Sequence, residues 1–261
     1  MQSQEIPLVI LDTPIPENAS HSSRSILEGE VKNIHVEHVA IANPIEDSSR
    51  DGHKAIYLFL TGTGDVIAGK INYAIVPETI FLPNAVENIT IKPANVDALQ
   101  YLKISCKLSA QDHLDIQKLP AANIQNPYYA KFTDCQSYSE AIKSPNTVSR
   151  TILSNEYIPR VAMGTVQTKG PDTVAAHEHP MLEQLFLGLS ENDCTVYADD
   201  CQVNFPELSI LHVPLGSSHS VSVEKDKVMY YVWMDFFIDK KGEEWLKTHK
   251  ADADQEASRG L

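Results

Sequence analysis

The chain has 261 residues, 43% of them hydrophobic, and a formal net charge of −14. This length allows one large or two small domains with a sizeable core. The acidic balance argues against nucleic acids and anionic membrane surfaces as partners, because both are bound through Lys and Arg side chains. The sequence has no apolar run long enough to span a membrane and no signal-peptide pattern at its N-terminus, so we expect a cytoplasmic protein.

The four cysteines, Cys106, Cys135, Cys194 and Cys201, form no CxxC pair. Cys194 and Cys201 are close enough in sequence to flank a hairpin, which leaves a disulfide between them open. We expect reduced thiols in a chain of this kind.

The N-terminal half consists of short apolar segments separated by turn residues. The run Ala55–Leu60 precedes a Gly-Thr-Gly turn, and a Pro-Glu turn at Pro77 precedes a strand that ends at Pro83. Many short strands joined by turns, in a chain with 15 prolines and 11 glycines, predict an all-β sandwich or barrel.

Residues 110–150 are polar and irregular, with turn-like prolines at Pro127 and Pro145. Within them, Ser137–Lys143 is predicted as a short helix. We place a domain boundary in this region, which gives an N-terminal domain of residues 1–125 and a C-terminal domain of residues 126–239.

The C-terminal half repeats the plan of the first. The strand Glu183–Leu187 precedes a turn at Gly188, a Pro-Glu turn at Pro206 precedes a strand ending at Pro214, and another strand follows. We aligned the halves by setting Leu58–Leu60 on Leu185–Leu187 and Pro83 on Pro214. The alignment puts residues unsuited to metal ligation opposite His177, His179, Glu183 and His219, namely Arg50, Gly52, Ile56 and Asn88.

The pattern His177-Glu-His179, with Glu183 and the distant His219, predicts a metal site. Side chains two residues apart in a strand point to the same face, so His177 and His179 are expected to converge. Three imidazoles and one carboxylate suit one divalent transition metal: Mn, Fe, Ni, Co or Zn. If the strand register differs by one, Gln184 replaces Glu183, but a carboxylate is the better ligand. The alternative is that these are ordinary solvated or core histidines.

Together with Gly170 and Pro214-Leu-Gly216-Ser-Ser-His219, these residues resemble the two motifs of the cupin family over about residues 160–236. The spacings around Gly170 and Gly188 depart from that pattern, and Leu208 and Val223 stand where the second motif has Gly and Asn. Two such units in tandem resemble a bicupin. The resemblance implies two jelly-roll (double-stranded β-helix) barrels, a degenerate N-terminal copy without metal, and a homodimer.

The strand from Val228 to Phe236 is apolar on both faces, and one face is expected to line the barrel. Tyr230 lies on one face and Tyr231 on the other. Arg160, on a predicted barrel strand, is a candidate for contact with an anionic substrate, but a surface arginine is the favoured interpretation.

These features predict an enzyme that acts on a small polar metabolite, such as a sugar, a sugar acid or another carboxylate. The expected reaction is metal-assisted isomerisation, with Glu183, Tyr230 and Tyr231 as candidate bases. A dioxygenase and a non-enzymatic ligand-binding or sensing cupin are the alternatives.

The segment 240–261 is expected to be a charged tail. A short amphipathic helix from Glu243 is predicted there, docked through Trp245.

Overall fold

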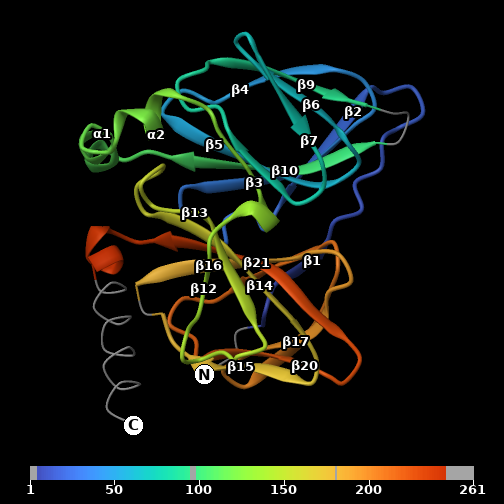
Figure 1. Ribbon diagram of the computed structural model, residues 1–261, viewed down its shortest axis with the longest axis vertical. Helices are drawn as coiled ribbons and strands as arrows, with labels where there is room; N and C mark the ends of the chain where they lie inside the picture. The colour runs from blue at the N-terminus through green and yellow to red at the C-terminus, as the bar shows by residue number, and fades with distance from the viewer. Residues whose placement is uncertain (1–4, 95–97, 180, 245–261) are drawn as a thin grey trace. The chain divides into compact units, whose positions relative to one another are not determined.

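The structure is a computed structural model that describes residues 5–94, 98–179 and 181–244. It divides into two compact units. The N-terminal unit comprises residues 11–135 and 156–159, and the C-terminal unit comprises the chain up to residue 10, residues 136–155 and the chain from residue 160 onward. Each unit is built from two antiparallel sheets (Figure 1).

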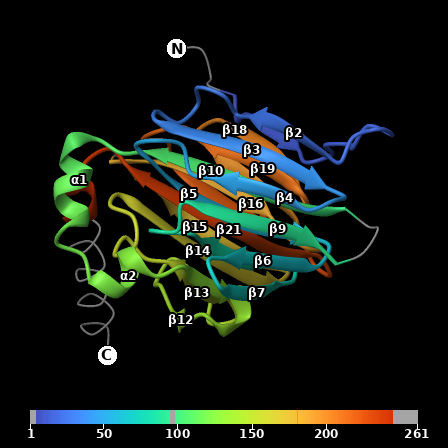
Figure 2. The same ribbon diagram turned by 90° about the horizontal axis from the view of Figure 1, so that it is seen from above.

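The N-terminal unit packs a six-stranded sheet against a four-stranded sheet. Its core lies between them and includes Tyr57, Phe59, Phe81 and Tyr101. The larger sheet has the order β11 (Tyr128–Lys131), β8 (Thr79–Leu82), β5 (His53–Thr61), β10 (Leu99–Lys107), β3 (Ile34–Ile41), β2 (His21–Ile26). The smaller sheet, visible in Figure 2, has the order β4 (Ile45–Ser48), β9 (Asn88–Pro93), β6 (Gly64–Ala68), β7 (Ile71–Ile75).

The C-terminal unit has the same two-sheet construction. In β20, Val221 and Val223 are buried while Ser220 and Ser222 are half-buried, which confirms the predicted alternation. The larger sheet has the order β1 (Leu8–Ile10), β19 (Ser209–Val213), β16 (Leu182–Gly188), β21 (Val228–Phe237), β14 (Val161–Lys169), β13 (Val148–Leu153), β12 (Ser137–Tyr138). The smaller sheet has the order β15 (Asp172–His177), β20 (His219–Val223), β17 (Asp193–Ala198), β18 (Cys201–Pro206).

The internal repeat predicted from the sequence is present in the strand order. The series β8-β5-β10-β3 in one unit corresponds to β19-β16-β21-β14 in the other, and β4-β9-β6-β7 corresponds to β15-β20-β17-β18. In both units the eight strands occur in the same chain order. The all-β architecture of two tandem jelly-roll units is therefore confirmed.

Along the chain, the N-terminal unit extends to residue 135, ten residues beyond the boundary predicted after residue 125. The reason is that β11 still belongs to the N-terminal unit. Tyr128–Lys131 pair with Thr79–Leu82 of β8 and form the edge strand of its sheet. The start of the chain belongs to the C-terminal unit. Leu8–Ile10 form β1 and pair with Ser209–Leu211 of β19, so this segment completes the C-terminal sheet.

The helices near the middle of the chain differ from the one predicted there. Ser137 and Tyr138 form β12, paired with β13, and the predicted helix over Ser137–Lys143 is wrong. Two short helices lie upstream instead: α1 (Ala110–Ile116) and α2 (Ala121–Gln125), followed by the 3₁₀ turn η1 (Phe132–Asp134). A capping box at Ser109 and Asp112 starts α1. Residues 240–244 are helical, as expected for the tail, whereas Trp245 lies outside the described residues.

Cys194 and Cys201 do lie on one hairpin, β17–β18, but not opposite each other. Cys194 faces Phe205, and Cys201 faces Ala198 beside the turn. All four cysteines are free thiols, as expected. None of the helices in the described part of the chain has the length and apolar character needed to cross a bilayer.

Candidate metal centre

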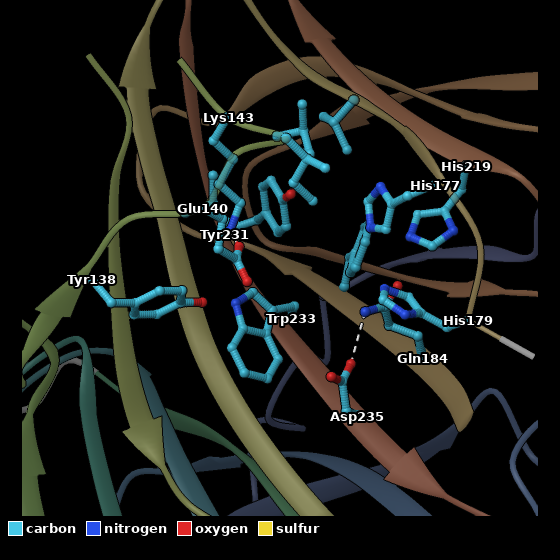
Figure 3. A pocket seen from close by; sticks show the side chains of 15 residues that line it. Tyr138, Glu140, Lys143, His177, His179, Gln184, His219, Tyr231, Trp233 and Asp235 are labelled. Atoms are coloured by element: carbon cyan, nitrogen blue, oxygen red, sulfur yellow. Dashed lines mark hydrogen bonds and ion pairs between the residues drawn. The ribbon is translucent and has the colours of Figure 1, made fainter. Parts of the chain in front are cut away.

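Three histidines of the C-terminal unit converge on one point. His177 ends β15, His179 follows two residues later, and His219 begins β20. Their ring centroids are 4.8 Å apart for His177 and His179, 4.3 Å for His177 and His219, and 5.3 Å for His179 and His219. One ligand nitrogen from each lies within 4.8 Å of the others. Figure 3 shows the three rings together on one side of a pocket.

Local strand geometry produces this convergence. His177 is the register partner of His219 across the β15–β20 pair, and the ladder is irregular between Val174 and His177. The irregularity turns the end of β15, so that His179 reaches the same point from outside the strand. The two histidines of the HxH pattern therefore meet although only one of them lies in a strand.

Backbone carbonyls orient two of the rings. His177 Nδ1 lies 2.8 Å from the carbonyl oxygen of Ala175, and His219 Nδ1 lies 3.2 Å from that of Ser217. If each Nδ1 carries the proton, each Nε2 keeps its lone pair, which is the arrangement that metal-binding histidines adopt. His219 Nε2 is buried, and none of the described residues forms a hydrogen bond with it. Burial, together with the neighbouring His177, lowers the pKa of His219 to about 4, so its ring is neutral near pH 7.

The structure does not bring Glu183 to this group. The Glu183 carboxylate lies 3.0 Å from His212 Nε2 on the other face of β16. His212 therefore has a structural role, as the partner of this carboxylate. Gln184, one residue later, lines the pocket instead. The assignment of Glu183 as a ligand is therefore corrected to the alternative register, because successive side chains of a strand point to opposite faces.

Asp235 of β21 fixes the amide of Gln184. Gln184 Nε2 donates a hydrogen bond of 2.7 Å to the Asp235 carboxylate, drawn as a dashed line in Figure 3. An ionised carboxylate can only accept hydrogen bonds, so it must face the amide nitrogen of Gln184. The amide oxygen therefore points away from Asp235. Gln184 Oε1 is buried and has no hydrogen-bond partner in the described part of the chain. Among the residues that line the pocket, Gln184 thus offers an oriented oxygen atom suited to metal ligation.

The pocket is small and largely apolar. It encloses about 70 Å³. Aromatic side chains and β-branched residues from both sheets form most of its wall: Tyr138, Ile142, Val166, Val174, Phe186, Val221, Tyr231 and Trp233. Its polar lining consists of Gln184 and the three histidines together with the acidic and basic side chains of Glu140, Lys143 and Asp235.

Of the candidate bases, only Tyr231 lines this pocket. Tyr231, Trp233 and Asp235 share the inner face of β21, and Tyr230 is buried on the opposite face. Complete burial raises the pKa of Tyr231 well above its usual value, so its phenol stays protonated. Arg160 does not line the pocket either, because its guanidinium binds the backbone carbonyl of Phe237 at 2.8 Å.

Asp235, Glu140 and Lys143 belong to the site but were not predicted from the sequence. An aspartate inside the otherwise apolar strand Val228–Phe237 was a signal for Asp235, since a buried carboxylate needs a partner. Glu140 and Lys143 gave no such signal, because they occur in a polar segment between the two repeats.

The corresponding positions of the N-terminal unit differ in chemistry. His219 pairs with Ala198, and the matching pair in the N-terminal unit is Ile89 with Ala68. The register partner of Ile89 on β4 is Asp47, at the place of His177. Ile89 therefore replaces Asn88 as the counterpart of His219, and Asp47 replaces Arg50 as the counterpart of His177.

The donor set fits a divalent transition metal. It offers three imidazole nitrogens within 4.8 Å of one another, and the amide oxygen of Gln184 lines the same pocket. Among the described residues, His219 Nε2 and Gln184 Oε1 are buried without a hydrogen-bond partner. In the described part of the chain, His177, His179 and His219 are the one such group of histidines, cysteines and carboxylates.

Solved structures of similar fold include several proteins of low sequence identity. A cupin 2 conserved barrel domain protein from Leptotrichia buccalis has a TM-score of 0.62 and 16% identity over 90% of this chain and 98% of that chain. An oxalate decarboxylase from Lactobacillus farciminis, solved as a formate complex, has a TM-score of 0.64 and 10% identity over 95% and 91%. A salicylate 1,2-dioxygenase from Pseudaminobacter salicylatoxidans has a TM-score of 0.63 and 9% identity over 83% and 76%.

By sequence, no protein-family model and no curated protein matches the chain. At these identities the structural likeness concerns the fold.

Proposed function

We propose that this chain, which has the bicupin fold, is a divalent-metal-dependent enzyme that isomerises a small carboxylate or a related polar metabolite in its C-terminal barrel. The observation that carries the proposal is the convergence of His177, His179 and His219 on the wall of a small pocket. Their nitrogens and Gln184 Oε1 would hold the metal. Such an ion polarises a carbonyl or hydroxyl oxygen of a bound substrate.

The charge of the donor set favours an anionic substrate. The donor set contains no carboxylate, because Glu183 contacts His212 on the other face of the strand. A divalent ion in this set keeps its full charge, and the apolar walls reduce the screening of that charge. A carboxylate or another anionic oxygen group is therefore favoured as the ligand.

The size of the pocket narrows the substrate class further. A cavity of about 70 Å³ suits a small organic acid better than a large sugar. Phe186, Tyr231 and Trp233 form aromatic walls that leave the substrate less exposed to water.

Metal analysis of the purified protein tests the proposal. We expect one divalent metal ion per chain by plasma mass spectrometry, and its loss in the His177→Ala/His179→Ala variant. The matched control is His35→Ala/His53→Ala in the N-terminal unit, which should keep the metal. Absence of metal from the wild type after reconstitution would contradict the proposal.

Turnover of a panel of small acids and sugar acids with Mn, Co, Ni, Zn or Fe then tests the enzymatic part. Activity that disappears in the His177→Ala/His179→Ala variant supports an enzyme. Thermal stabilisation by a panel member without turnover would instead indicate a non-enzymatic binding protein.

A dioxygenase is the second candidate, favoured by the aromatic and aliphatic walls, which suit an apolar substrate and dioxygen. It predicts oxygen uptake by the iron-loaded protein with a substrate of the panel. Metal-dependent turnover without oxygen uptake would favour isomerisation.

A further inference from the structure

The segment between the two repeats forms one wall of the pocket. We name residues 139–147 the strap, because they connect β12 to β13 across the C-terminal unit. Ala175 N, two residues before His177, donates a hydrogen bond of 2.9 Å to the carbonyl oxygen of Ile142 in the strap. Near the end of the strap, Ser144 and Thr147 donate hydrogen bonds to the Asp172 carboxylate at 2.6 Å and 3.2 Å. The strap is thus tied directly to the strand that carries the first histidine.

An ion pair on the strap faces the pocket. Lys143 Nζ forms a salt bridge with the Glu140 carboxylate, and the Lys143 side chain is only 7% exposed. Lys143 also donates to Ser149 Oγ at 3.1 Å and lies over the Tyr138 ring at 5.4 Å from its centroid. These contacts hold the carboxylate of Glu140 in place. Figure 3 shows the pair across the pocket from the histidines.

The other ionisable groups around Glu140 are less suited to accept a proton. Asp235 is engaged by Gln184. Burial and nearby carboxylates raise the pKa of both Tyr138 and Tyr231, with Glu140 among these carboxylates, so both phenols stay neutral. Glu140 is 25% exposed and therefore has access to solvent, through which a proton can be exchanged.

We infer that Glu140 exchanges a proton with the ligand held at the three-histidine site, and that Lys143 is its positioning residue. The inference rests on the proposed function. In the isomerisation of a hydroxy-carbonyl compound, Glu140 takes the proton as a C–H bond breaks, and the electron pair of that bond moves toward the adjacent carbonyl group. The proton then returns to the neighbouring carbon while the hydroxyl proton passes between the two oxygens, so no other reactant is needed.

Oxalate binding to the zinc-loaded protein tests the inference without knowledge of the substrate. A new anion beside Glu140 favours its protonated form, so oxalate binding should take up protons. Calorimetry in two buffers of different ionisation enthalpy measures the number of protons taken up. The comparison uses the wild type, Glu140→Gln, Lys143→Met and, as a matched control, Glu224→Gln, which removes an exposed carboxylate.

We expect the wild type and Glu224→Gln to take up more protons than Glu140→Gln at equal zinc content. Protons consumed by solvent displaced from the zinc are common to all variants and cancel in this difference. Lys143→Met should move the pH of largest uptake upward, since the loss of the ammonium favours the protonated acid. This shift also tests the inference if Glu140→Gln fails to fold.

Equal proton uptake by the wild type and Glu140→Gln would overturn the inference, as would an unchanged pH profile in Lys143→Met. Either result, with zinc and oxalate both bound, leaves the proposed function intact. Failure of the wild type to bind zinc contradicts the proposed function itself, and this inference with it.

Discussion

Glu183 and Gln184 are neighbours on β16, and the choice between them is decided by which face of the strand meets the pocket. Gln184 pairs in register with Asp235 of β21, whereas Glu183 pairs with Phe236. The pocket face therefore carries an amide and a carboxylate in hydrogen-bond contact, and the amide oxygen is the atom that we propose as a metal ligand. A neutral ligand such as this amide would leave the positive charge of a bound metal ion available to attract an anionic substrate.

This arrangement predicts opposite results for two adjacent variants. Glu183→Gln should keep its zinc affinity, because that carboxylate contacts His212 and not the metal site. Gln184→Leu should weaken zinc affinity by roughly tenfold, since the oxygen donor is lost. Competition with a chromogenic chelator measures both affinities. Loss of zinc from Glu183→Gln, with Gln184→Leu unchanged, would restore the first assignment of the ligands.

His38 of the N-terminal unit makes stability depend on pH. Burial, with a smaller effect from Arg24, lowers its pKa to about 4. In the unfolded chain the ring takes up a proton below about pH 6.5, whereas in the folded protein it stays neutral until about pH 4. The free energy of unfolding should therefore be constant above pH 6.5 and fall by about 3 kcal/mol toward pH 4 through this residue.

Urea denaturation of the metal-free protein at several pH values measures this loss. His38→Gln should show a shallower fall between pH 6.5 and pH 4 than the wild type, and His21→Gln, which changes an exposed histidine, should follow the wild type. Parallel curves for the wild type and His38→Gln would show that another group causes the fall.

At the scale of elements, the C-terminal barrel depends on a strand from the far end of the chain. β1 pairs with β19, and Pro7 O accepts a hydrogen bond of 3.0 Å from His212 N. Ile6 is 9% exposed and belongs to the core of this unit, whereas Ile10 is 46% exposed. The two isoleucines therefore form a matched pair with different burial.

Ile6→Ala should lower the free energy of unfolding by about 2 kcal/mol, because a large buried side chain leaves a cavity. Ile10→Ala should change it by less than about 0.5 kcal/mol, as expected of an exposed position. Thermal or urea unfolding followed by circular dichroism measures both. Equal effects of the two substitutions would show that the segment before β1 does not contribute to the core.

At the scale of the whole molecule, one architecture is used twice with different interiors. In the N-terminal unit, Asp47 occupies the place of His177, and its carboxylate forms a salt bridge with Lys103 of β10. Lys103 also donates to the Ser48 carbonyl oxygen at 3.1 Å. The interior of this barrel therefore contains an ammonium group where the other barrel has its imidazoles.

Lys103→Met should destabilise the protein by about 2–4 kcal/mol, since it leaves the Asp47 carboxylate without its cation in a mostly buried position. Lys92→Met, at an exposed position of β9, should have little effect. Urea denaturation measures both, and the zinc content of the C-terminal barrel should be unchanged. A Lys103→Met protein as stable as the wild type would mean that the ion pair contributes nothing to stability.

Much of this architecture could be read from short stretches of the chain. Alternating apolar residues and Pro and Gly turns depend on neighbours in sequence, and they predicted the strands, the all-β class and the repeat. His177, His179 and His219 were found for the same reason, because their spacing and the PxGxxH pattern are local. The alignment of the repeats was wrong by three residues at Arg50 and by one at Asn88, since local turns do not reveal strand register.

By itself, the sequence determined the strand-rich double fold and the three histidines, because alternation and turn chemistry act between residues close along the chain. Tertiary structure alone decided that Gln184 faces the pocket, that β1 completes the distant barrel and that the strap carries Glu140 and Lys143 to the site. These features depend on pairing between segments far apart in sequence, as when β16 aligns with β21 and the strap bonds to β15. Register across such pairs is set by the packing of both strands together, and a single strand does not encode it.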